Sequence, residues 1–330
     1  MIQNEVEETV NVLSEEGELC GAYWAREPLF VLDQSRIWTA RRYCTFQDVY
    51  IIFSNSFLFV FEMCDNGAFS FLHVSAVSLL DRHTLSKTIK FPVFSDGIHF
   101  SSKNRPLEFI VMDDETHIIK VDIPQIGNNR RLRGEVVLFN PNNAQSLYMT
   151  ANWHDEKKSF KLIRSSPWWS VEGVMQFENT DLPFLRNRAW GIYYNVKMAR
   201  SKNDIHYWAA GCGMQDGRQF AFSIGYGGEN SSSCTENAAF VNGILIKLEY
   251  VTFQVSPVSM LSVWSFTSNN KQLTMNFYPL QIDKYSIFFL NHSDSAQRVF
   301  GFFSGVFILN DGSEFHFNKL CGVVEYRRRT

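Results

Sequence analysis

The fold class of this chain is decided by residues 205–247, which read IHYWAAGCGMQDGRQFAFSIGYGGENSSSCTENAAFVNGILIK. Apolar runs alternate here with glycine-containing breaks, two of which are Asp216-Gly217 and Asn242-Gly243. Both dipeptides are typical of two-residue hairpin loops, because both turn residues must tolerate a positive φ. The stretch therefore predicts antiparallel strands joined by tight turns.

Strand-like segments of this kind recur along the whole chain, and segments with a helical period are scarce. We expect strands over Val49–Ser54, Ser56–Cys64, Ala68–Leu80, Thr88–Phe94, Leu107–Val111, Thr116–Ile123, Gly134–Phe139, Ser146–Trp153, Ser159–Ile163, Val171–Phe177, Trp190–Met198, Ile205–Ala210, Gln219–Ile224, Ile244–Val255, Gln272–Phe277, Ser286–Asn291, Phe300–Leu309 and Glu314–Asn318. A further hairpin is predicted at Asn310-Asp311-Gly312. Roughly twenty short strands predict an all-β protein: two lipocalin-like antiparallel β-barrels or strongly curved sheets packed together, with few short helices.

The chain offers one helical candidate and one candidate domain boundary. The acidic segment Asn4–Glu16 is predicted as a short helix, because Val6, Val10 and Leu13 would share a face. The charged, Pro-containing region Ile123–Arg133 is the best place for a boundary. We therefore expect an N-terminal β-barrel or sheet over 1–135 and a C-terminal β-barrel over 136–330.

Charge and hydropathy exclude several classes of partner. The 31 basic and 34 acidic residues give a net charge of -3, whereas nucleic-acid binding needs a clustered basic face. The short basic run Arg327–Arg329 is expected to be solvated. No stretch reaches the roughly 18 apolar residues that span a bilayer, and residues 1–19 do not read as a signal peptide. We expect neither nucleic-acid binding nor a membrane span.

The six cysteines indicate the compartment. None of them forms a C-x-x-C pair with metal-ligand spacing, and most lie beside apolar neighbours. Buried free thiols in a reducing environment are the expected outcome, which places the protein in the cytoplasm. The scattered histidines likewise predict no metal site, and no cofactor is expected.

Several motifs, in order along the chain, carry a resemblance to a known family. They are Gly21–Leu29 (GAYWAREPL), Asn140-Pro141-Asn142 with Gln145-Ser146-Leu147 before a strand ending in Asn152-Trp153, Trp208-Ala209-Ala210, Gly217-Arg218, Gly225, Thr235–Ala238, Phe300–Gly305 and Asp311-Gly312. Across most of its length the chain resembles the uncharacterised family numbered twenty-eight-zero-four among the domains of unknown function. That family is similar to two-barrel, calycin-like proteins, a set that includes carotenoid hydratase and tocopherol cyclase. The resemblance implies two β-barrels and an apolar cavity, but no particular activity, because one fold hosts many functions.

The chain departs from the family pattern in two places. Asn195 stands where the family usually has an aspartate, and His206-Tyr207-Trp208-Ala209 replaces a Trp-Asn-Trp-Ala motif. An asparagine cannot donate or accept a proton as a carboxyl group does. Both departures weaken the interpretation as an enzyme.

An isoprenoid hydratase or cyclase would need a tuned acid and aromatic faces that stabilise a carbocation. The acids near the central motif are Glu236, His206, Glu172 and Asp181, and the aromatic candidates are Trp208, Trp190, Tyr193 and Tyr207. Glu236 is more simply interpreted as a turn residue beside Thr235 and Asn237, His206 as a core or rim histidine, and the tryptophans as packing groups. We therefore predict no catalytic residue.

The sequence leaves three functions open. The first is binding of an apolar small molecule, lipid-like or isoprenoid-like, in a barrel cavity; the second is a non-catalytic scaffold held by protein partners in an assembly. The third is an enzyme of the hydratase or cyclase kind. The candidate ligand-binding residues are Trp190, Tyr193, Asn195, Arg200, His206, Trp208, Thr235, Glu236 and Asn237.

Overall fold

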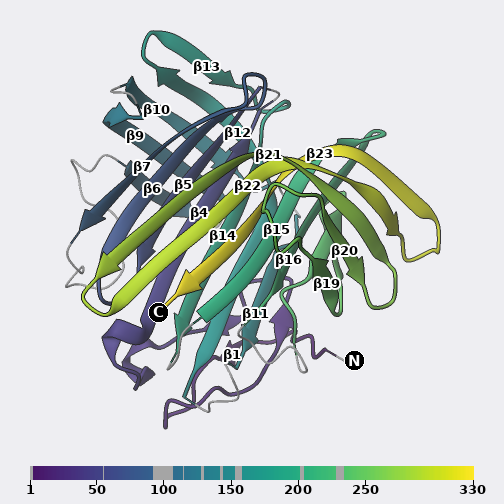
Figure 1. Ribbon diagram of the computed structural model, residues 1–330. Helices are drawn as coiled ribbons and strands as arrows, with labels where there is room; N and C mark the ends of the chain where they lie inside the picture. Colours follow the sequence, from purple (N-terminus) through teal and green to yellow (C-terminus); the bar gives the residue numbers. More distant parts are fainter. Residues whose placement is uncertain are drawn as a thin grey trace.

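The computed structural model describes residues 3–54, 56–91, 107–113, 115–127, 130–141, 144–152, 158–200, 204–227 and 234–330. Within these ranges the backbone forms 23 strands and two short 3-10 helices, η1 (Gln34–Arg36) and η2 (Arg41–Tyr43). All but two of these strands lie in two large, strongly curved sheets that pack together, and the other two, β1 (Val10–Asn11) and β3 (Phe30–Val31), pair with each other (Figure 1). The predicted all-β architecture is confirmed.

The first sheet is antiparallel throughout and holds most of the N-terminal strands. Its order is β7 (His83–Phe91), β6 (Ser70–Ser78), β5 (Phe57–Asp65), β4 (Cys44–Phe53), β14 (Trp190–Ala199), β12 (Phe160–Phe177), β10 (Arg130–Phe139), β9 (Thr116–Ile126) and β8 (Leu107–Asp113). Beside β12 lie β11 (Leu147–Ala151) and β13 (Thr180–Phe184), and β2 (Trp24–Ala25) pairs with β11.

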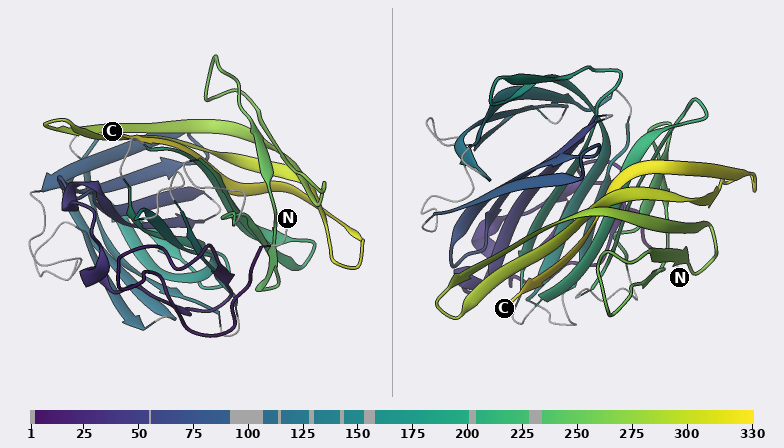
Figure 2. Two further views of the ribbon diagram at one scale, coloured as in Figure 1. Left: turned by 90° about the horizontal axis from the view of Figure 1, so that it is seen from below. Right: turned by 45° about the horizontal axis from the view of Figure 1, so that its top comes forward.

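The second sheet is also antiparallel and is built from the C-terminal part of the chain. Its order is β18 (Ile244–Lys247), β17 (Ala238–Val241), β16 (Arg218–Tyr226), β15 (Asp204–Gln215), β23 (Glu314–Arg329), β22 (His292–Ile308), β21 (Leu273–Phe289), β20 (Trp264–Ser268) and β19 (Val251–Gln254). Figure 2 shows that β21–β23 are long enough to run beyond the second sheet's own core and across the first sheet.

The three largest apolar cores of the described residues follow from the alternation of side chains along these strands. The concave face of the first sheet encloses a core that includes Tyr50, Ile52, Phe59, Val136 and Trp169. The concave face of the second sheet encloses a core that includes Phe222, Trp264, Phe277, Phe303 and Val324. The third core joins the two sheets and includes Val49, Ile51, Val60, Trp208 and Phe300. Each curved sheet therefore wraps its own interior and shares its outer face with the other.

The two dipeptide turns predicted within residues 205–247 are present. Asp216 and Gly217 have φ values of 50° and 75° between β15 and β16, and Asn242 and Gly243 have 51° and 80° between β17 and β18. Positive φ at both central residues is the property that links Asp-Gly and Asn-Gly to such hairpins. The hairpin at Asp311-Gly312 likewise connects β22 to β23.

The helix predicted over Asn4–Glu16 is wrong. The backbone amides of Val6, Val10 and Val12 bond to the carbonyls of Trp24, Leu29 and Val31, so the segment pairs with residues 24–31 instead of closing helical turns. Strand β1 (Val10–Asn11) lies parallel to β3 (Phe30–Val31). Valine has a stiff, branched Cβ that suits extended pairing, and this tertiary pairing overrides the weak helical pattern.

Several predicted segments merge into longer strands. Ser159–Ile163, apart from Ser159, and Val171–Phe177 are parts of β12, and Gln272–Phe277 and Ser286–Asn291 fall mostly within β21. The expected boundary near residue 135 falls inside β10, whose residues pair on both sides within the first sheet. The chain passes from the first sheet to the second between Ala199 and Asp204. Asn142, Trp153 and residues 92–94, which the predicted turn and strands include, lie outside the described residues.

Candidate functional site

Glu236, in the loop before β17, is buried between the two sheets. Its Oε1 accepts hydrogen bonds from Lys161 Nζ at 3.0 Å and His206 Nε2 at 2.5 Å. Its Oε2 accepts one from the Tyr194 hydroxyl at 2.7 Å. The residue therefore joins β12 and β14 of the first sheet to β15 of the second.

The carboxylate of Glu236 occupies space that is free only because Gly225 has no side chain. A Cβ atom at Gly225 would lie 2.1 Å from Oε1 of Glu236, far closer than any non-bonded contact allows. The amide of Gly225 also donates to Oδ1 of Asn237 at 2.8 Å. The glycine of the central motif is required because Glu236 passes directly over it.

Thr235 and Asn237 hold the loop on either side of Glu236. The ammonium of Lys247 donates to the carbonyls of both residues, at 2.6 Å and 3.0 Å, and Asn237 Nδ2 donates to the carbonyl of Glu249 at 2.8 Å. Burial lowers the pKa of Lys247 to about 8. Thr235 and Asn237 are thus turn-forming residues, whereas the carboxylate of Glu236 bonds to side chains of other strands.

The charge state of Glu236 follows from its neighbours. Burial by itself raises the pKa of this carboxyl, but His206 and Lys161 beside it hold the pKa well below the ordinary range. Glu236 is consequently ionised and bound by two basic groups and a phenol. A carboxylate held in this way cannot serve as a proton donor near neutral pH, and we assign it to the joint between the sheets.

The predicted tryptophans lie in the same apolar layer between the sheets. Trp208 packs against Tyr194, with ring centroids 4.7 Å apart, and its indole donates to Oγ of Ser223 at 3.0 Å. Trp190 stacks on Trp168 at 4.4 Å. Each therefore has a neighbouring ring packed against it, but Trp208 is buried, whereas Trp190 is only partly buried.

Arg200 belongs to a buried network of charges at the other end of this layer. Its guanidinium donates to Oδ1 of Asn66, whose amide in turn reaches Asp294. The network joins both sheets and comprises Gln47, Glu62, Asn66, Arg200, Asp204, Asp294, Arg298, Glu325, Arg327 and Arg329. Burial raises the pKa of Asp294 to about 7, against the lowering effect of Arg329. These groups fix the sheets' relative position through paired charges.

The prediction that Arg327–Arg329 form a solvated basic run is wrong for two of the three residues. Strand β23 continues to Arg329, so successive side chains alternate between the faces of the sheet. Arg327 and Arg329 are buried against Glu62, Asp294 and their neighbours, and only Arg328 is exposed.

Tyr193 and Asn195 point to the opposite face of β14, inside the concave face of the first sheet. Asn195 lies directly opposite Asp48 of β4, and its amide donates to Oδ1 of Asp48 at 2.9 Å. The Tyr193 hydroxyl donates to the same oxygen at 2.7 Å. The predicted ligand-binding residues therefore divide between the two faces of β14, and only Tyr193 and Asn195 lie on the concave face.

Asp48 was missed by the sequence reasoning, which considered acids only near the central motif. The signal was present in the run Cys44–Phe53, where Asp48 is the one charged residue of a mostly apolar strand. Glu172 and Asp181, which were considered as acids, are exposed at the surface. The chain therefore carries a carboxyl group beside Asn195, on the neighbouring strand.

Arg164, Asn195 and Asp48 form one row across β12, β14 and β4, because Asn195 is in register with both of the others. All three are only partly buried, although most residues around them on these strands are buried. Burial raises the pKa of Asp48, against the lowering effects of its bonds from Tyr193 and Asn195.

An aromatic row lies beside this polar one. Tyr50 stacks on Tyr193 with ring centroids 4.6 Å apart, and its hydroxyl lies 2.7 Å from Nδ1 of His117. Trp169 packs against His117 at 4.5 Å, and the guanidinium of Arg164 lies over the Tyr193 ring at 5.3 Å. Burial raises the pKa of both tyrosines well above the usual value, so both phenols stay neutral.

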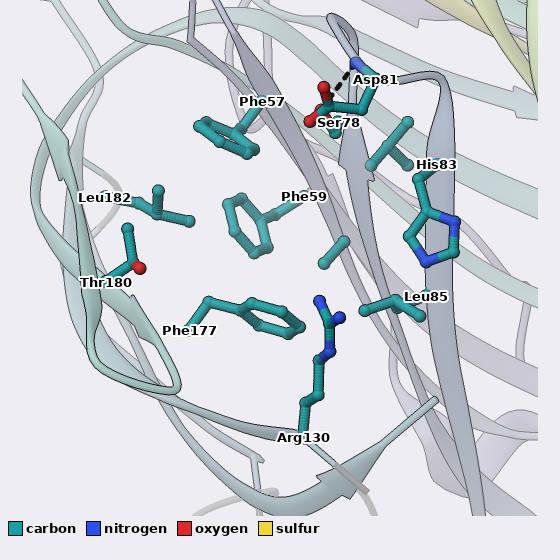
Figure 3. A pocket seen from close by; sticks show the side chains of 12 residues that line it. Phe57, Phe59, Ser78, Asp81, His83, Leu85, Arg130, Phe177, Thr180 and Leu182 are labelled. Atoms are coloured by element: carbon teal, nitrogen blue, oxygen red, sulfur yellow. Dashed lines mark hydrogen bonds between the residues drawn. The ribbon is translucent and has the colours of Figure 1, made fainter. Parts of the chain in front are cut away.

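A pocket of ≈ 310 Å³ opens at the rim of the same concave face. It is lined by Phe57, Phe59, Ala76, Val77, Ser78, Asp81, His83, Leu85, Arg130, Phe177, Thr180 and Leu182. Figure 3 shows Phe57, Phe59, Phe177 and Leu182 surrounding the space, with the guanidinium of Arg130 extending into it between Phe177 and Leu85. The walls are thus apolar, and Arg130 supplies a positive charge within them.

Comparison with known proteins assigns the family. The model of the family described as Domain of unknown function (DUF2804) matches residues 3–330. The chain belongs to this family. None of the curated proteins compared with this DUF2804 protein matches it.

Solved structures of similar fold have the same two-sheet architecture. Kievitone hydratase from Nectria haematococca superposes with a TM-score of 0.56 at 8% identity, over 87% of this chain and 88% of that chain. CghA with Sch210972 superposes with a TM-score of 0.51 at 9% identity, over 87% and 88% of the two chains. At these identities the likeness concerns the fold of the DUF2804 protein.

No helix in the described residues is both long and apolar enough to cross a membrane.

Proposed function

We propose that this protein binds a small, mostly apolar molecule that contains a ring and carries an anionic oxygen group. The pocket between Phe57, Phe59, Phe177 and Leu182 is the observation that supports this proposal (Figure 3). Its volume lies at the lower end of the range for small-molecule sites, roughly 300–1,000 Å³, and such sites are mostly apolar with few polar groups.

Arg130 supports the anionic part of the proposal. Its guanidinium lies 5.5 Å from the centre of the Phe177 ring and faces the pocket (Figure 3). Its ion pair with Glu178 is long, at 3.8 Å, and about half of each side chain is exposed (46% and 54%). Such surface pairs contribute little free energy, so a carboxylate or phenolate of a ligand can replace Glu178.

The aromatic walls support the ring. Phe59 stacks with Phe61 and meets the edge of Phe184, so its position is fixed by neighbours in the core. Aromatic side chains favour stacked or edge-on contacts with other rings. A flat, ring-containing molecule therefore suits these walls better than a long flexible chain.

Binding of 8-anilinonaphthalene-1-sulfonate, an aromatic anion, tests the proposal. Wild-type protein is expected to bind one equivalent with enhanced emission, and Ala76→Leu, which fills the pocket, should abolish this. Arg130→Gln should weaken binding by about tenfold through loss of a charge-assisted contact. Arg131→Gln is the matched control, because Arg131 lies next in sequence and pairs instead with Asp122. Binding by both pocket variants that equals the wild-type value, with unchanged Tm, would overturn the proposal.

A further inference from the structure

The row of Arg164, Asn195 and Asp48 on the concave face contains charged groups that binding of a small molecule does not require. Asp48, Tyr50 and Ile52 alternate onto this face of β4, and Ile52 is in register with the pocket residue Phe59. Asp48 lies four residues from Ile52, which corresponds to about 13 Å along the strand. The carboxyl group and the pocket therefore lie on the same face of the first sheet, with the buried Tyr50 and Ile52 between them.

The two oxygens of Asp48 differ in their surroundings. Oδ1 accepts hydrogen bonds from Tyr193 and Asn195, whereas Oδ2 receives no hydrogen bond from the described residues. The two donors anchor Oδ1, and Asp48 is only partly buried on the concave face, which leaves Oδ2 for a further partner. A carboxyl group with one oxygen anchored and the other available is the geometry of a general acid or base.

A positive charge stands in the same row. Arg164 is separated from Asp48 by Asn195 alone, and its guanidinium is held over aromatic rings, including those of Tyr148 and Tyr193. A fixed guanidinium of this kind stabilises negative charge that develops on a bound molecule. The neutral phenols of Tyr50 and Tyr193 add hydrogen-bond donors without adding charge.

We propose that Asp48 is a general acid–base residue that exchanges a proton through Oδ2 with a small organic molecule on the concave face, while Arg164 stabilises the resulting anion. Tyr193 and Asn195 are positioning residues. This inference rests on the proposed binding of a small molecule to that face. It assigns the acid–base role to Asp48 of β4, opposite Asn195, and leaves Glu236 in the joint between the sheets.

The elimination of 5-nitrobenzisoxazole provides a test with a defined probe. The Asp48 carboxylate removes the proton from carbon 3, the electrons of that C–H bond form the nitrile, and the N–O bond breaks. The negative charge ends on the phenolate oxygen of 2-cyano-4-nitrophenolate, which absorbs visible light, and the proton passes from Asp48 to water. The reaction needs no other co-reactant.

Wild-type protein is expected to accelerate this reaction about 100-fold or more over Asp48→Asn, the usual scale of general base catalysis. Glu172→Gln, which removes an exposed carboxylate of β12, is the matched control and should retain the wild-type rate. Tyr193→Phe should shift the inflection of the pH–rate profile to higher pH, because the lost hydrogen bond stabilises the ionised carboxylate. A merely structural role of Tyr193 would lower the rate without moving the inflection.

The outcomes separate this inference from the proposed function. Equal rates for wild type and Asp48→Asn, with 8-anilinonaphthalene-1-sulfonate still bound, would overturn the acid–base role alone. Failure of the wild type to bind the dye would overturn the proposed function. A large loss of rate in Asp48→Asn with dye binding unchanged supports both.

Discussion

Asn195 donates its side-chain amide to the carboxyl group of Asp48, which lies directly opposite it on the adjacent strand β4. The sequence places an asparagine where relatives of the chain are expected to have an acid. The structure shows a carboxyl group one strand away, on the same face of the sheet. Substitution of Asp48 is therefore the most informative change that can be made in this protein.

Asp48→Asn should not destabilise the protein at neutral pH. The pKa of Asp48 is raised in the folded state, so its contribution is most favourable below the unfolded value of about 3.9 and is lost as the pH rises through the folded value. Asparagine avoids this cost, and we expect a gain of up to about 1 kcal/mol at pH 8, smaller at pH 5. Urea unfolding at both pH values measures it; a loss of stability at pH 8 would show that the carboxylate is structural.

Glu236→Gln should destabilise the protein strongly. The change leaves Lys161 and His206 buried without their counter-charge, which costs about 3–5 kcal/mol. Since the pKa of Glu236 is lowered in the fold, its contribution is present above the unfolded pKa of about 4.5 and is lost as the pH falls below it. Chemical unfolding between pH 7 and about pH 3 should show the difference between variant and wild type shrinking below about pH 4.5, as the pH falls toward the lowered folded pKa.

The double variant Glu236→Gln with Lys161→Met serves as the control for that measurement. Removing both charges should recover part of the lost stability, because Met retains the apolar stem without the charge. Additive losses in the double variant would show that Glu236 and Lys161 act independently.

Gly225→Ala should destabilise the protein because of Glu236 and not because of backbone strain. The added Cβ would meet Oε1 of Glu236 at 2.1 Å, whereas the positive-φ Gly312 has open space around its Cβ position. Gly312→Ala should cost only about 1 kcal/mol, the usual scale for a strained glycine replacement. Thermal unfolding should show a larger loss for Gly225→Ala, and a smaller one when Glu236 is also changed to Ala; an equal loss in that background would refute the clash.

Arg327→Met and Arg328→Met should differ sharply although the residues are adjacent. Arg327 is 1% exposed and pairs with Glu62 and Asp294, so its loss leaves each of these buried carboxylates with one guanidinium in place of two, at a cost of about 3 kcal/mol. Arg328 is exposed, and its substitution should change the stability by less than about 0.5 kcal/mol. Unfolding in guanidinium chloride measures both variants, and an equal loss of stability in the two would show that the alternation along β23 does not control stability.

The local signals in the sequence predicted the strands and turns well. Asp216-Gly217 and Asn242-Gly243 form the expected hairpins because the required backbone conformation depends on those two residues alone. The continuity of β12 and β21 was not predictable in the same way. Charged and polar residues within these strands read as breaks, whereas pairing with long neighbours carries the strands through them.

The site residues were predictable only in part, for a related reason. Asn195, Trp208 and Glu236 were identified from motifs, and Tyr193 as an aromatic residue near them. Which face of a strand a residue occupies depends on register with distant segments. Asp48 comes next to Asn195 only because β4 pairs with β14, and these two strands are far apart in the chain. A lone carboxylate in an apolar strand was the one local signal that could have pointed to it.

The long strands β21–β23 have a consequence for how this architecture can change. One end of each strand completes the core of the second sheet, and the other end supplies the counter-charges and hydroxyl that Glu62 of the first sheet requires. Removing the second sheet would leave the buried carboxylate of Glu62 without its partners, so neither sheet is expected to fold alone. Redesign or duplication of this scaffold therefore has to keep both sheets together.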